Sequence, residues 1–133
     1  APLHDESNYR AFQARLQAAV ADPGEQLDAI NRYLATQPGE SYRDSAADMR
    51  RAVLAEIRER VRRAMQHAAL AAPQDDPAQW HTEQVVALEE WRGRYEPIDP
   101  ELARFFLEQR QALLREFAGR ELDAIYARSQ RAE

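Results

Sequence analysis

The sequence lacks several residue types, and each absence removes a class of chemistry. The chain of 133 residues contains no cysteine, which excludes disulfides, thiolate nucleophiles and cysteine-based zinc sites. It also contains no lysine, so its 18 basic residues are all arginine, which excludes Schiff-base catalysis and a P-loop. There is no run of about 18 apolar residues, so no transmembrane segment is expected.

The remaining composition is that of a bacterial globular protein. The chain is 44% hydrophobic and 31% charged, which separates it from disordered sequences. Abundant alanine, with arginine in place of lysine, is typical of GC-rich bacterial genomes. The net charge of −5 argues against nucleic acid as a partner, because that binding depends on cationic contacts to phosphate. A periplasmic or secreted location and a cytoplasmic location both fit a chain without cysteine.

Helix start signals recur along the chain as Asp-Pro pairs. They are Asp22-Pro23, Asp76-Pro77 and Asp99-Pro100. Aspartate at an N-cap accepts hydrogen bonds from amides of the first turn, and proline at the first helical position has its φ preset. Gly93 is expected to end a helix as a left-handed C-cap.

Apolar residues at spacings of three and four predict five helices and no strand. The expected ranges are 6–21, 23–36, 42–70, 77–92 and a last helix from residue 100. The connections are short, which favours antiparallel packing. We expect one all-α domain over residues 1–133, an antiparallel bundle of about five helices. A short hairpin of the first two helices is expected to pack on three longer ones.

The second and third predicted helices meet at a turn flanked by tyrosine and proline. The residues concerned are Leu27, Ile30, Tyr33, Leu34, Pro38, Tyr42, Ala46 and Ala47. This segment, about residues 25–57, resembles a bacterial tetratricopeptide-like (TPR-like) helical hairpin. The resemblance implies peptide or protein binding on a groove, although a tetratricopeptide helix would end about half way along the third predicted helix. An ordinary helical turn is the alternative.

No set of residues predicts catalysis. The three histidines are His4, His67 and His81, and none has a glutamate or histidine three or four residues away, as helical metal motifs require. We therefore predict no catalytic residue, no metal ligand and no cofactor, and a chain that is not an enzyme.

The last predicted helix carries two apolar faces. The first, from Leu102 to Phe117, is expected to face the core. The second lies more than about 100° further round the helical wheel. It comprises Leu107, Leu114, Ala118, Leu122 and Ile125. Either the helix breaks at Gly119, or this second face is an exposed surface for another protein or a second copy. The alternative is that the first two helices cover it.

Three arginines of the third predicted helix form a basic stripe. Arg51, Arg58 and Arg62 line one flank of its apolar face. Such a stripe suits an anionic membrane surface, an acidic partner or phosphate. Neutralisation of acidic residues in neighbouring helices is the alternative.

Arg50 and the aromatic residues raise a third hypothesis. Arg50 falls inside the apolar face of its helix, where a guanidinium must meet a carboxylate or reach solvent. If it instead lines a pocket, it would contact a small ligand beside Trp80 and Trp91. Aromatic residues at helical spacing are nevertheless expected to be core. They are Trp80, Trp91, Tyr95, Phe105, Phe106, Phe117 and Tyr126.

These patterns predict, first, a non-enzymatic protein-interaction or assembly module that acts through the second face of the last helix. The second prediction is a helical bundle that docks on anionic lipid through its arginine stripe. The third is a small-ligand sensor or enzyme with a pocket near Arg50 and the tryptophans.

Overall fold

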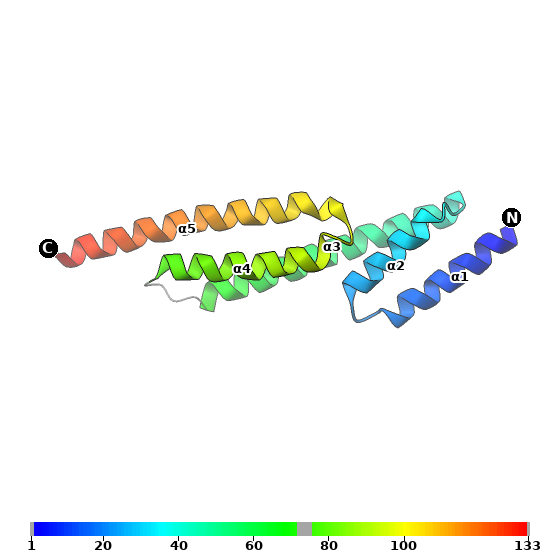
Figure 1. Cartoon of the computed structure of the whole chain (residues 1–133), viewed down its shortest axis with the longest axis horizontal. Coiled ribbons are helices and arrows are strands. Elements are labelled where there is room, and N and C mark those ends of the chain that lie inside the picture. The colour runs from blue at the N-terminus through cyan, green and yellow to red at the C-terminus, as the bar shows by residue number, and fades with distance from the viewer. Residues whose placement is uncertain (1, 72–75, 133) are drawn as a thin grey trace. The chain divides into compact units, whose positions relative to one another are not determined.

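The computed structural model describes residues 2–71 and 76–132, and every regular element among them is helical (Figure 1). The α-helices are α1 (Pro2–Ala18), α2 (Pro23–Ala35), α3 (Glu40–Ala71), α4 (Pro77–Tyr95) and α5 (Ala103–Ala132). A 3-10 helix, η1 (Pro100–Leu102), precedes α5. The predicted all-α fold is confirmed. None of the described helices is long and apolar enough to cross a membrane.

Two of the predicted helix caps form as expected. The Asp22 carboxylate accepts hydrogen bonds from the amides of Gly24 at 2.9 Å and Glu25 at 3.4 Å. Asp76 accepts from the amide of Gln79 at 3.0 Å. Each aspartate therefore satisfies amides that have no partner inside the helix.

The prediction that Gly93 ends α4 is wrong. No described glycine has a positive φ, and α4 continues to Tyr95. The helix ends just before Pro97, whose ring lacks an amide donor and disfavours helical geometry in the preceding residue. The proline, rather than the glycine, is therefore the stop signal.

Contacts between residues divide the chain into two compact units. The first unit consists of Ala1–Arg60 and Arg94–Pro100, and the second consists of Val61–Gly93 and Glu101–Glu133. Helix α3 contributes its first part to one unit and its last part to the other.

In the first unit, α1 and α2 form an antiparallel hairpin (Figure 1). Its apolar side packs on the first part of α3 around four buried residues, Phe12, Ile30, Tyr33 and Ala46. The rings of Phe12 and Tyr33 stack with centroids 4.3 Å apart and planes inclined by 2°. This stack joins α1 to α2, and the ring of Tyr9 on α1 contacts that of Tyr42 on α3, with centroids 4.8 Å apart.

In the second unit, the last part of α3 lies with α4 and α5, and α4 and α5 run in opposite directions (Figure 1). The ring of His81 on α4 stacks on Phe117 of α5, with centroids 4.5 Å apart. The largest fully buried side chains of this unit are Trp80, Phe106, Leu88, Leu102 and Val61.

Candidate interaction surface on helix α5

Helix α5 is a single α-helix through Gly119, which excludes a break at this residue. A Cβ added at Gly119 would meet open space, so the glycine is not required by a close packing contact. The two apolar faces predicted from the sequence therefore belong to one continuous helix.

The first apolar face of α5 is the buried one. Phe105, Phe106 and Leu113 are only 5%, 2% and 7% exposed. The guanidinium of Arg62, on α3, lies over the Phe105 ring at 5.2 Å from the centroid. This face is the contribution of α5 to the core of the second unit.

The second apolar face of α5 is exposed to solvent. Leu107 is 56% exposed, Leu114 51%, Leu122 67% and Ile125 54%. Ala118, between them, is also exposed. We call these five residues the α5 stripe. At 1.5 Å per residue it extends over about 27 Å of helix.

The C-terminal part of α5 has few neighbours on any side. Between residues 118 and 131, only Arg120 and Ala124 are partly buried, and the others are exposed. Tyr126 is 67% exposed, so the expectation that it belongs to the core is wrong. It lies beyond Leu113, the last buried residue of α5, where the packed part of the helix has ended.

A groove of about 1030 Å³ lies beside this part of α5, next to the start of α4. Most of its lining is charged or small, and Ile125 is its one large aliphatic residue. The groove therefore meets the α5 stripe at Ile125, and the stripe is the more apolar of the two surfaces.

Charged residues border the α5 stripe on both sides. Arg110, on the side towards α4, reaches Glu89 at 3.5 Å. Glu108 and Arg115 lie on the opposite side and are exposed. Glu108 accepts from Arg104 at 3.3 Å within the helix, and both side chains are more than half exposed. Such exposed pairs contribute little to folding and can exchange partners readily.

The predicted arginine stripe is divided among different contacts. Arg51 forms an ion pair with Asp48 one turn before it. Arg58 is partly buried, and Arg62 lies over Phe105. Arg51 and Arg58 belong to the first unit, whereas Arg62 belongs to the second.

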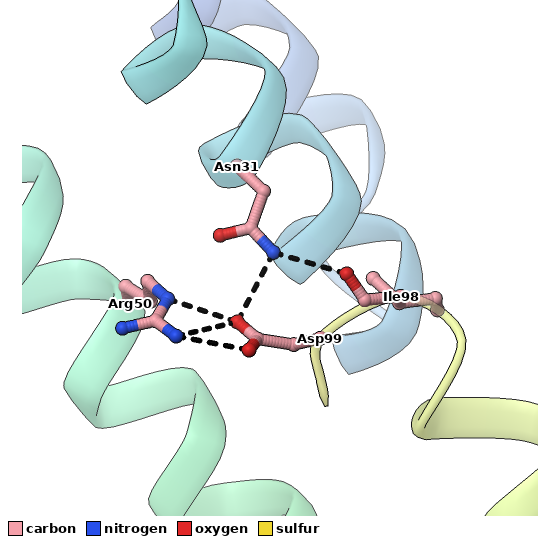
Figure 2. A network of polar contacts seen from close by, with 4 residues as sticks. All are labelled: Asn31, Arg50, Ile98 and Asp99. Carbon is pink, nitrogen blue, oxygen red and sulfur yellow. Dashed lines mark hydrogen bonds and ion pairs between the residues drawn. The ribbon is translucent and has the colours of Figure 1, made fainter. Parts of the chain in front are cut away.

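Arg50 pairs with a buried carboxylate (Figure 2). Its Nε and Nη2 donate to the two oxygens of Asp99, both at 2.9 Å, and Asp99 is only 4% exposed. Asn31 Nδ2 donates to Asp99 at 3.1 Å and to the carbonyl of Ile98 at 3.2 Å. The network ties α2, α3 and the segment before η1 together within the first unit. The sequence predicted that Arg50 needs a carboxylate or contact with solvent, and it predicted Asp99 as a helix cap. It gave no sign that Asn31 belongs to the network.

The tryptophans of the ligand hypothesis lie in the second unit, whereas Arg50 lies in the first. Trp80 is 1% exposed, and the Arg120 guanidinium covers its ring at 4.1 Å from the centroid. Arg120 also donates to the carbonyl of Ala69 at 3.3 Å. Trp91 is only partly buried. In the described part of the chain, no group of three or more potential metal ligands comes together.

The fold and this surface define an all-α protein with one long apolar helix face open to solvent. Comparison with protein families, curated proteins and solved structures gave no match to this chain. The tetratricopeptide-like resemblance of residues 25–57 accordingly rests on the sequence pattern alone.

Proposed function

We propose that the chain is a non-enzymatic protein-interaction or assembly module, and that the α5 stripe is its binding surface. The observation that carries the proposal is the exposure of four large aliphatic side chains, between 51% and 67%, along one side of one helix. Single exposed apolar residues are common on folded proteins, but a continuous row of them is typical of a binding surface.

The spacing within the stripe indicates the kind of partner. Leu107 and Leu114 are seven residues apart, Ala118 follows after four, and Ile125 after seven more. These intervals place all four residues on one seam with a heptad repeat, which is the pattern that packs against another helix. We therefore expect the partner to present a helix with an apolar face of its own.

The expected affinity depends on how much of the stripe residues' side chains is still exposed in the single chain. Leu107 and Leu114 are about half buried in the single chain, so complete burial of each adds about 1 kcal/mol. Association costs at least about 4 kcal/mol in lost rotational and translational freedom. The burial of a few such leucines exceeds this cost by only a small free energy, so we expect reversible binding of moderate affinity.

The test compares two adjacent leucines. Leu113 is 7% exposed and Leu114 is 51% exposed. A glutamate in place of Leu113 buries a charge and should unfold the second unit, whereas Leu114→Glu should leave the free energy of unfolding within about 1 kcal/mol of the parent. Leu114→Glu should abolish association measured by light scattering after size exclusion. Equal destabilisation by the two substitutions would show that Leu114 is core and would refute the proposed function.

A further inference from the structure

We propose that the partner of the α5 stripe is a second copy of this chain, docked antiparallel along α5. This inference rests on the proposed function and names the partner that the stripe recognises. It is carried by the positions of the charges along the stripe, which complement themselves when the helix direction is reversed.

The complementarity defines one register of the two helices. Arg104 and Glu121 lie on the same seam as the apolar residues, Arg104 one turn before Leu107 and Glu121 between Ala118 and Ile125. When two antiparallel α5 helices are centred between Ala112 and Leu113, Arg104 of each copy faces Glu121 of the other. In the same register Leu107 faces Ala118 of the second copy. Leu114 faces Gln111 of the second copy, and the Arg104–Glu121 pairs flank this segment on both sides, whereas Leu122 and Ile125 lie beyond it.

The solvent-facing flank of the seam fits the same register. Glu108 and Arg115 are exposed and lie one turn on either side of Gln111. In the antiparallel arrangement Glu108 of one copy comes next to Arg115 of the other, and flanking pairs of this kind set the orientation of paired helices. The opposite flank is taken by the Arg110–Glu89 pair within the chain.

Other pairings of the same stripe oppose like charges. A parallel pair in register places Arg104 against its own copy and Glu121 against its own copy. An antiparallel pair shifted by one heptad brings Leu107 against Ile125, but it places Arg104 against Arg128 and Arg115 against itself. Like charges at close range are destabilising, so the charges favour the first register, whereas the shifted register pairs more of the apolar residues.

The side chains that this register needs are accessible in the single chain. Gln111, Arg115 and Glu121 are exposed, and the Arg104 side chain is 89% exposed although it contacts Glu108. In the pairing Arg104 and Glu108 exchange their surface contact for contacts to the second copy. Over residues 103–122 the two helices would overlap for about 30 Å.

The first test uses the absence of cysteine, because a single introduced thiol is the only one in the chain. Leu107→Cys carrying a tag is mixed with untagged Ala118→Cys and treated with a short bis-maleimide. Cross-linking between the two variants, with little within either, is expected. In this register two copies of residue 107 are separated by about 16 Å along the helix, beyond a short linker. Cross-linking of Leu107→Cys mainly with itself, or preferentially with Ile125→Cys, would overturn the proposed arrangement.

The second test exchanges the charges without changing the apolar seam. Arg104→Glu and Glu121→Arg should each weaken the dimer about 10-fold, because each opposes like charges twice in a symmetric pair. The double variant should return the dissociation constant, measured by sedimentation equilibrium, to within about 3-fold of the parent. Arg43→Glu, an exposed change on α3 in the first unit, is the control. Failure of the double variant to recover association would contradict the pairing.

Two different results would separate a failure of the second-copy proposal from a failure of the proposed function. A parent that stays monomeric at millimolar concentration, with Leu114→Glu equally stable, would overturn the second copy as partner and leave the stripe as a surface for another protein. A monomeric parent that Leu114→Glu unfolds would overturn both.

Discussion

Removal of either partner of the Arg50–Asp99 pair should destabilise the first unit, and the two losses should be unequal. The Asp99 side chain is 5% exposed and that of Arg50 is 28% exposed. Arg50→Ala leaves a buried carboxylate without its guanidinium and should cost about 3 to 4 kcal/mol. Asp99→Ala leaves a guanidinium that can turn partly towards water, so we expect a smaller loss of about 2 to 3 kcal/mol.

Urea unfolding followed by circular dichroism at 222 nm measures these losses. The double variant should be no less stable than Arg50→Ala alone, because no buried charge remains, and the resulting double-mutant cycle should give a coupling energy of about 2 kcal/mol. Arg51→Ala is the matched control, since Arg51 is the next residue and forms an exposed ion pair with Asp48. It should cost under about 1 kcal/mol. Additive losses, or a larger loss for Asp99→Ala than for Arg50→Ala, would refute this account of the network.

Three further predictions concern single residues. Burial, with a smaller contribution from Asp5, raises the pKa of Tyr33 above its usual 10.0, and its buried hydroxyl has no hydrogen-bond partner among the described residues. Above a pH of about 10 the Tyr33 phenol therefore stays neutral in the folded state while it ionises in the unfolded chain, so the free energy of unfolding should fall as the pH rises. Tyr33→Phe should reduce this pH dependence, measured by urea unfolding. Gly119→Ala should increase the free energy of unfolding by up to about 1 kcal/mol, and with it the melting temperature and the helical circular dichroism signal. Alanine favours the helix more than glycine does, and its methyl group would contact no other side chain. A loss of helicity would argue against a continuous α5. Asp22→Ala should cost about 1 kcal/mol through loss of the α2 cap, and an unchanged urea midpoint would show that the cap contributes nothing.

Local signals in the sequence predicted the helices but misplaced the end of α4 and both ends of α1, which was expected over residues 6–21 and spans Pro2–Ala18. The caps at Asp22 and Asp76 depend on neighbours within three residues, so they can be read without knowledge of the fold. At the end of α4 two such signals compete, and Pro97 determines the boundary while Gly93 stays helical. A glycine permits a left-handed turn but does not force one, whereas a proline removes a donor.

The sequence near a polar residue does not show which distant residue it pairs with. The position of Arg50 in an apolar face predicts that it needs a partner, but Asp99 is 49 residues further along the chain. Nothing in the periodicity around residue 31 or residue 99 indicates that these side chains meet. For the α5 stripe, the helical wheel identified the residues, and only the structure showed that Leu107 and Leu114 are half exposed.

The exposed end of α5 has a consequence for the dynamics of binding. An isolated helix of fewer than about 12 to 15 residues is marginal in water, and residues 118–131 are a segment of that length with few packing contacts. Its amides should exchange with solvent far faster than those of residues 105–113, where Phe105, Phe106 and Leu113 hold the helix in the core. A partner that docks on the stripe would slow that exchange, and part of its binding energy would go into ordering the last turns of the helix. Recognition at this end would thus couple association to local folding, and the affinity would respond to helix propensity at positions that never touch the partner.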